Sequence, residues 1–343
     1  MKAAVFKEPF KIETEEMPMP QITDDQVLLK VMSCGICGSD LHGFAGQSGK
    51  RRLPGLIMGH EGAGQVVEVG KNVSGVNPGD RAAVDPQQPC GKCYYCQRGW
   101  WNICENLVVL GSSMRSFQHG MMCEYVALEP RQLIGLPENV SFEEGTFLDP
   151  VSNVTHVLDR CSVNLADTIA IIGAGVMGLV AVQLARFKGY TKIIAVDCID
   201  SRLERAKNLG ADVTVNSAAE DCVQRIRRET GGLGADVVME AAGLGITYQY
   251  AVEAVRKRGT VLALGFRDAE IPVSSQTFLF RELTIIGCGG FSFEARKSME
   301  LISSGRVGVQ TLITDRFPLD RAQEGFMVLH DNPAASIKVI LNM

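Results

Sequence analysis

Residues 168–189, TIAIIGAGVMGLVAVQLARFKG, decide the fold of the second half of this chain. The stretch opens with an apolar, β-branched run that is typical of a buried strand. Glycines at positions 173, 175 and 178 follow in the spacing G-x-G-x-x-G, and a helical apolar stretch completes it. A strand, a glycine-rich turn and a helix in this order predict one unit of a parallel sheet.

The same turn predicts a dinucleotide site. Its glycines allow the backbone to approach a ligand closely, and the helix N-terminus presents N–H groups to a pyrophosphate. Asp197 ends the next apolar run, 19 residues after Gly178. A carboxylate there can bind both ribose hydroxyls and repels a 2′-phosphate, which favours NAD over NADP, although the nearby Arg202 could serve a phosphate. The predicted cofactor-binding residues are Gly173, Gly175, Val176, Met177, Gly178, Asp197 and Arg202.

Strands and helices alternate from residue 151 to about residue 289, so this part is predicted to be a Rossmann domain with a doubly wound parallel sheet. Residues 1–150 contain short β-branched runs broken by Gly and Pro, which indicates an irregular β-rich domain. A helix and a closing strand are expected within residues 290–343, and this tail can return to the first domain. The predicted fold class is therefore α/β with two domains, as a length of 343 residues also suggests.

The composition argues against several kinds of partner. With 46% hydrophobic and 21% charged residues and a net charge of −5, the chain gives no sign of binding nucleic acid or a membrane surface. No apolar run is long enough to cross a bilayer, and the N-terminus lacks a signal peptide. We therefore expect a cytoplasmic protein. Eleven cysteines in such a chain point to metal sites or reactive thiols and not to disulfides.

Four of these cysteines lie in one stretch, PCGKCYYCQRGWWNIC, at residues 89–104. Cys90, Cys93, Cys96 and Cys104 have the spacing C-x2-C-x2-C-x7-C, which can close a tetrahedron around zinc. Four thiolates leave no open position for a substrate, so we expect a structural site. An iron–sulfur cluster or a set of uncoordinated thiols is the alternative.

A second possible metal group is scattered along the sequence. Cys37 and His60 offer sulfur and nitrogen ligands, and Glu61 and Asp149 offer oxygens. A site with few protein ligands and an exchangeable water is what a catalytic zinc needs. The spacing alone does not establish this site.

Together these residues resemble the zinc-dependent medium-chain alcohol dehydrogenases. The stretch GHEGAGQVVEVGKNVSGVNPGDRAAVDP, the four-cysteine loop and IIGAGVMG occur in that family's order, and the match covers essentially the whole chain. The resemblance implies a GroES-like catalytic domain over residues 1–150, completed by about 290–343, with the Rossmann domain at 151–289 inserted between them. It also implies two zinc ions per subunit, NAD as cofactor, a small-molecule alcohol substrate, and a homodimer or homotetramer.

The resemblance assigns roles one position at a time. Cys37 and His60 look like the catalytic zinc ligands, and Asp149 falls where relatives place a third ligand. Glu61 is similar to a carboxylate that binds zinc in some members and lies behind it in others. Ser39 resembles the hydroxyl that bonds the substrate oxygen, and His42 the histidine that passes the proton to solvent.

The stretch DPVSNVTH at residues 149–156 looks most like the polyol and threonine dehydrogenase branch. The expected reaction is oxidation of a secondary alcohol, such as a polyol, a sugar alcohol or a hydroxy-amino acid, to a ketone. Gly43 replaces an aromatic residue that is common in sorbitol enzymes, which suggests a roomier pocket. The basic run Lys50, Arg51 and Arg52 leaves a phosphorylated or otherwise anionic sugar alcohol as an alternative substrate, against the simpler alternative of a solvated turn. A non-catalytic NAD-binding protein is the alternative of another class.

Overall fold

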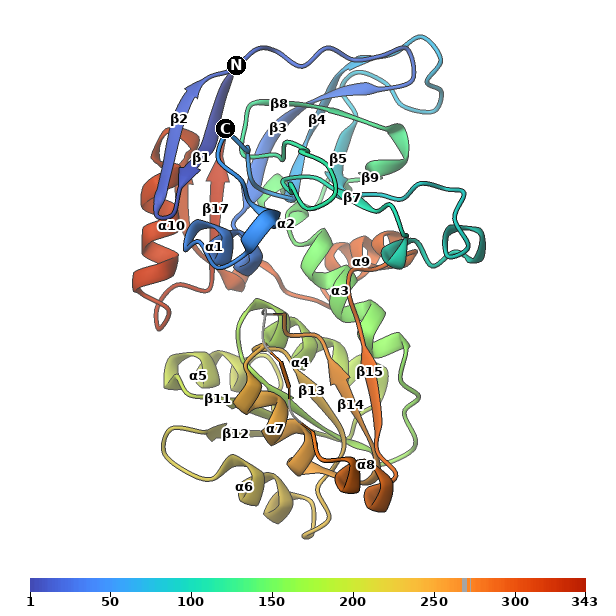
Figure 1. The fold of residues 1–343 in the computed structure, drawn as a ribbon, viewed down its shortest axis with the longest axis vertical. Helices are drawn as coiled ribbons and strands as arrows, with labels where there is room; N and C mark the ends of the chain where they lie inside the picture. The colour runs from blue at the N-terminus through green and yellow to red at the C-terminus, as the bar shows by residue number, and fades with distance from the viewer. Residues whose placement is uncertain (267–269, 272) are drawn as a thin grey trace. The chain divides into compact units, whose positions relative to one another are not determined.

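The structure is a computed structural model that describes residues 1–266, 270–271 and 273–343. The chain divides into two compact units (Figure 1). The first combines Met1–Ser152 with Phe291–Met343, and the second is Asn153–Gly290. The boundary falls inside one helix, α3 (Leu148–Asp159).

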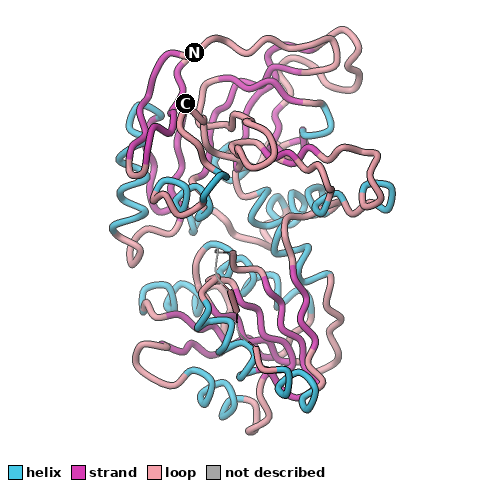
Figure 2. The backbone as a smooth tube through the Cα atoms, viewed as in Figure 1, coloured by secondary structure: helices cyan, strands magenta, loops and turns pink. Residues whose placement is uncertain are grey.

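The unit Asn153–Gly290 contains a six-stranded sheet in the order β12-β11-β10-β13-β14-β15, and every neighbouring pair is parallel. Figure 2 shows the strands of this sheet in magenta with helices in cyan beside them. The order reverses between β10 and β13, as in a doubly wound dinucleotide-binding fold. The predicted α/β fold class is thus confirmed. The strands are β10 (Thr168–Ile172), β11 (Lys192–Asp197), β12 (Val213–Asn216), β13 (Ala235–Glu240), β14 (Val255–Ala263) and β15 (Thr284–Gly287).

Helices connect these parallel strands. Helix α4 contacts β10 and β11, whereas α7 contacts β13 and β14. The central strands β11, β10 and β13 are buried along most of their length, as strands covered on both faces require, and Ile194 and Val238 have no exposed surface. The helices are α4 (Val176–Lys188), α5 (Asp200–Asn208), α6 (Cys222–Glu229), α7 (Gly245–Ala254) and α8 (Ser275–Arg281).

The other unit is β-rich. Its main sheet has the order β16-β17-β3-β4-β5-β9, with β8 also paired to β3. A hairpin of β1 and β2 and a short ribbon of β6 and β7 accompany it. The strands are β1 (Lys2–Glu8), β2 (Lys11–Glu16), β3 (Val27–Gly35), β4 (Glu61–Val69), β5 (Arg81–Val84), β6 (Gln87–Gln88), β7 (Val108–Val109), β8 (Tyr125–Leu128), β9 (Leu133–Gly135), β16 (Ile313–Pro318) and β17 (Lys338–Asn342).

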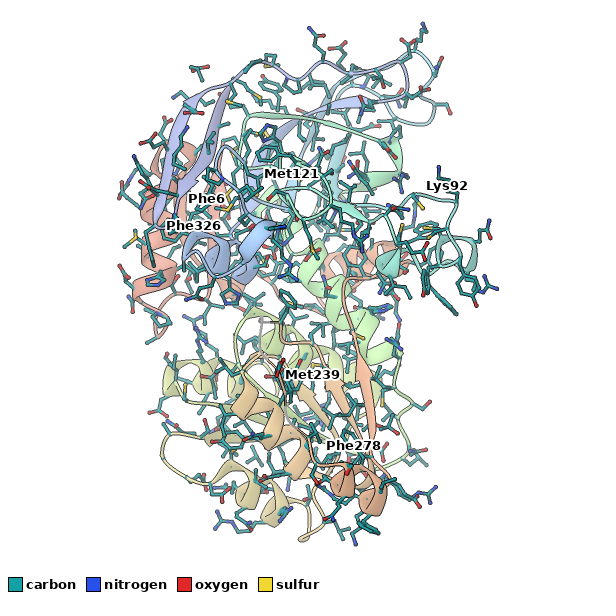
Figure 3. All side chains as sticks on the ribbon, in the orientation of Figure 1. Phe6, Lys92, Met121, Met239, Phe278 and Phe326 are labelled. Carbon is teal, nitrogen blue, oxygen red and sulfur yellow. The ribbon has the colours of Figure 1, made fainter. Side chains whose placement is uncertain are left out.

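The closing strand of the chain returns to this first unit. Strand β17 pairs antiparallel with β3, so that Leu341 lies opposite Cys34, and the two chain ends lie in one unit (Figure 1). Phe6, Met121 and Phe326, labelled in Figure 3, belong to a core that β1, residues 121–123 and helix α10 share. The helices of this unit are α1 (Gly38–Phe44), α2 (Phe142–Gly145), α9 (Glu294–Ser303) and α10 (Ala322–Asp331). In the described part of the chain, no helix has the length and apolar character needed to cross a membrane.

Candidate active site and metal centres

The four predicted thiols of the 89–104 loop come together. Lys92, labelled in Figure 3, belongs to this loop. The sulfur atoms of Cys90 and Cys96 are 4.0 Å apart, and those of Cys93 and Cys104 are 3.8 Å apart. Zinc–sulfur bonds of about 2.3 Å give a tetrahedron with edges of about 3.8 Å. The cage therefore has the size of a closed four-sulfur zinc site.

Two features of the loop suit a bound cation. The backbone N–H groups of Lys92 and Cys93 lower the pKa of the Cys90 thiol to about 6, which favours the thiolate that zinc requires. The loop is also held in place, because Trp101 packs on Phe293 with ring centroids 4.5 Å apart. The neighbouring Trp100 is 49% exposed.

The second group forms where two strands and a helix meet. Pairing of β3 with β4 places Gly35 opposite Glu61. Cys37 lies two residues after Gly35, directly before helix α1. His60 comes directly before β4. Ligand atoms of Cys37, His60 and Glu61 lie within 4.8 Å of one another. The sheet register thus assembles a sulfur, a nitrogen and an oxygen donor from positions 24 residues apart in the sequence.

Asp149, in the first turn of α3, lies beside this trio but outside it. The residue is partly exposed, while its carboxyl lies deep among protein atoms. Burial raises the pKa of Asp149 to about 7, and the nearby Glu61 charge adds to the effect. The structure therefore brings together three of the four predicted ligands and places the fourth next to them.

A lysine that the sequence analysis did not identify completes the group. Lys338 in β17 forms an ion pair with Glu61, and the two side chains are 1% and 2% exposed. Burial opposes the charge of Lys338, but Glu61 raises its pKa, so the pair is ionic. Gly35 makes room for it, because a Cβ there would lie 2.7 Å from Lys338 Cε and 2.8 Å from a Glu61 oxygen. The sequence feature that could have identified this buried cation is a lysine inside the apolar run IKVILNM.

The charges of this group fit a divalent cation. When ionised, Cys37, Glu61 and Asp149 carry three negative charges, and Lys338 supplies one positive charge. The remaining two negative charges are what Zn²⁺ neutralises, and the sulfur, nitrogen and oxygen donors are a set that zinc binds in proteins. The residues present therefore fit a zinc ion.

Two expectations about the neighbouring loop are wrong. Arg52 is not a solvated member of the basic run, because its side chain is 7% exposed and its Nη2 donates to Asp40 Oδ1 at 2.9 Å. The pocket is not enlarged at Gly43 either, because the Arg52 side chain occupies that space and a Cβ on Gly43 would lie 2.4 Å from Arg52 Cγ. Lys50 is exposed and Arg51 partly so.

The predicted proton-relay residues lie on one helix. Ser39 and His42 are three residues apart in α1, so their side chains lie on one face, and both are partly exposed. Helix α1 starts at Gly38, directly after the candidate ligand Cys37. Both groups are therefore placed within one helical turn or two of the metal group.

The glycine-rich turn has the conformation that the sequence predicts. Gly173 has φ +103°, and a Cβ on Gly178 would lie 1.8 Å from the Gly173 carbonyl oxygen, so both positions require glycine. A Cβ on Gly175, which precedes α4, would meet nothing within 4 Å, which leaves open space beside the turn. The first-turn amides of Val176 and Met177 have no intrahelical acceptor and can face an anion.

Asp197 lies at the end of β11, against this turn. Its Oδ2 accepts the Ala174 N–H at 2.7 Å, and its Oδ1 accepts the Ile199 N–H at 3.0 Å. Each oxygen keeps a second lone pair for a ribose hydroxyl. Arg202 lies 4.0 Å from Asp197 Oδ2, so the two predicted specificity residues are brought together.

Comparison with known proteins agrees with this architecture. The sequence profile of the alcohol dehydrogenase GroES-like domain matches residues 23–138, and that of zinc-binding dehydrogenases matches residues 176–304. A sorbitol dehydrogenase of Bombyx mori is 34% identical over 98% of this chain and 97% of that protein. The chain belongs to the zinc-dependent medium-chain alcohol dehydrogenase family.

Other relatives of the family bear on cofactor and substrate. A D-arabitol-phosphate dehydrogenase of Enterococcus avium is 33% identical over 91% of this chain and 88% of that protein. The crystal structure of a zinc-binding dehydrogenase from Sinorhizobium meliloti, bound to NADP, has a TM-score of 0.91 and 32% identity, covering 100% of this chain and 99% of that one. The chain is therefore an alcohol dehydrogenase of the polyol type. Family membership also removes the non-catalytic alternative.

Proposed function

We propose that this enzyme oxidises a secondary alcohol of the polyol or sugar-alcohol class to a ketone, with NAD as hydride acceptor. The observation that carries the proposal is the trio of Cys37, His60 and Glu61, whose ligand atoms lie within 4.8 Å of one another. We assign these residues, with Asp149 beside them, to the catalytic zinc. Cys90, Cys93, Cys96 and Cys104 are assigned to a structural zinc.

When bound, the catalytic zinc acts as a Lewis acid that lowers the pKa of an alcohol hydroxyl toward neutrality. Ser39 Oγ accepts the hydrogen bond of the substrate hydroxyl, and its position in α1 directs the proton toward His42. His42 is partly exposed, so its imidazole can exchange that proton with solvent. Glu61 and Asp149 supply carboxylates at the site, and Lys338 balances one of their charges.

The cofactor half of the proposal depends on residues of one unit. The turn at Gly173, Gly175 and Gly178 and the amides of Val176 and Met177 receive the pyrophosphate. Asp197 binds the adenosine ribose and favours NAD, because its carboxylate repels a 2′-phosphate. Arg202 at 4.0 Å from Asp197 is the group that would moderate this preference.

A phosphorylated polyol is the second candidate substrate. It is supported by the exposed Lys50 and the partly exposed Arg51, which keep two cations at the surface of the loop. Arg52 no longer supports it, because that cation is paired with Asp40. Activity toward sugar-alcohol phosphates that falls in a Lys50→Ala/Arg51→Ala variant would favour this substrate class.

We further propose that the protein is cytoplasmic and forms a homo-oligomer. None of the eleven cysteines is joined to another in a disulfide, which suits a reducing compartment. Strand β15 is an edge strand of the six-stranded sheet, and its Ile285 is 41% exposed. The edge of β15 is therefore available to pair with a second copy of the chain.

The test is NAD reduction by zinc-loaded protein against a panel of polyols, polyol phosphates, butanediol and L-threonine. A chelator control and a metal determination accompany it. We expect two zinc ions per chain and one substrate class whose oxidation the chelator abolishes. Cys37→Ser should remove turnover while NADH binding, followed by fluorescence, remains. Full turnover by that variant would refute the assignment.

A further inference from the structure

A buried arginine lies behind the candidate ligand His60. Arg52 Nη2 donates to Asp40 Oδ1 at 2.9 Å, and the second oxygen, Asp40 Oδ2, lies 3.5 Å from His60 Nδ1. The Asp40 side chain is 0% exposed and those of Arg52 and His60 are 7% and 11% exposed. One carboxylate thus connects the arginine to the imidazole, with little solvent around the three groups.

The same carboxylate also reaches the second candidate ligand. The backbone N–H of Cys37 donates to Asp40 Oδ2 at 3.3 Å, because Asp40 is the third residue of helix α1. Burial by itself would raise the pKa of Asp40, but the charges of His60 and Arg52 hold it well below its usual value. A fully buried carboxylate without such a cation would lose much of this stabilisation.

Gly43 leaves the space that the Arg52 side chain occupies. A Cβ on Gly43 would lie 2.4 Å from Arg52 Cγ and 3.1 Å from Arg52 Cβ, so the stem of Arg52 passes directly over this glycine. The Arg52 Nη1 also donates to the Arg51 carbonyl oxygen at 3.1 Å. The glycine and the arginine therefore form one structural feature, in which the missing side chain at position 43 admits the cation to the interior.

We propose that Arg52 is a positioning residue of the catalytic zinc site. It holds Asp40 by its guanidinium, and Asp40 in turn orients His60 through Nδ1, which leaves Nε2 for the metal. Partners of this kind behind a metal ligand fix the ring orientation and contribute to metal affinity. The inference rests on the proposed function, since it requires zinc at Cys37 and His60.

The test compares retention of the two zinc ions in one molecule. Wild-type, Arg52→Met and Lys50→Met proteins are loaded with zinc, and release to a competing chelator is followed with metal determination. Replacing Arg52 should weaken binding of one zinc about 10- to 100-fold. The zinc of the four-cysteine loop should be released at the wild-type rate, which makes it an internal control for folding. Lys50→Met, from the same basic run but exposed, should release both ions as the wild type does.

A second variant covers the case in which Arg52→Met does not fold. Gly43→Ala keeps every charge but displaces the Arg52 stem, so it should also weaken one zinc selectively. The inference would be overturned if the Arg52→Met or Gly43→Ala protein held both ions as tightly as the wild type. It would also be overturned if either variant lost both ions equally. A wild type that holds a single zinc would overturn the proposed function itself, whereas two tightly held ions in every variant would overturn only the role of Arg52.

Discussion

Replacement of Lys338 by Met tests how Glu61 is neutralised in the core of the first unit. The substitution keeps the length of the side chain but removes the ammonium group, which leaves a Glu61 carboxylate that is 2% exposed without its cation. Removing one partner of a buried ion pair costs about 3–5 kcal/mol. For a unit of this size, 1 kcal/mol corresponds to about 2–4 °C in melting temperature, so a loss of about 6–20 °C is expected for zinc-free protein.

Zinc should reduce this loss if Glu61 can bind it. A divalent cation within reach of the Glu61 oxygen takes over the role of the ammonium group, so Lys338→Met should cost the zinc-loaded protein less than half of what it costs the zinc-free protein. Melting curves of both variants, each with and without zinc, measure the difference. The double variant Lys338→Met/Glu61→Gln removes both charges and should recover most of the zinc-free stability.

Two outcomes would refute this reasoning. Equal losses with and without zinc would mean that zinc does not neutralise Glu61. A loss below about 1 kcal/mol in zinc-free protein would mean that the pair is not the source of stability that its burial indicates.

Three further results are expected. Cys93→Ser should leave one zinc per chain and lower the melting temperature, as metal analysis and calorimetry would show; two retained ions would contradict a closed four-sulfur site. Gly178→Ala places a Cβ 1.8 Å from the Gly173 carbonyl oxygen, so NADH affinity measured by fluorescence should fall at least about tenfold, and unchanged affinity would contradict the assigned turn. In zinc-free protein burial opposes the charge on His60, but Asp40 and Cys37 raise its pKa, so zinc must displace a proton. Zinc affinity should therefore rise at least about tenfold per pH unit below that pKa, since Cys37 must also give up its proton to bind as a thiolate. Competition titrations at several pH values would show a flat profile if this is wrong.

The sequence alone determined the parts that depend on local pattern. The G-x-G-x-x-G turn, the Asp at the end of the next strand and the four closely spaced cysteines each lie within about 30 residues. Their geometry follows from chain conformation: Gly173 needs a positive φ, and four thiols on a short loop reach one point in space. Alternation of apolar strands with helices likewise predicted the parallel sheet, because the period of side-chain burial is a local property.

The tertiary structure decided what depends on contacts between distant segments. Only the pairing of β3 with β4 and β17 shows that Lys338 meets Glu61, a partner 277 residues away, because sheet register is not written in either segment alone. The burial of the Arg52 side chain also could not be predicted from the sequence. Three adjacent basic residues have the same sequence pattern whether their side chains are solvated or buried. Its burial depends on the space left by Gly43 and on the buried charge of Asp40, and three-dimensional packing alone brings those three residues together.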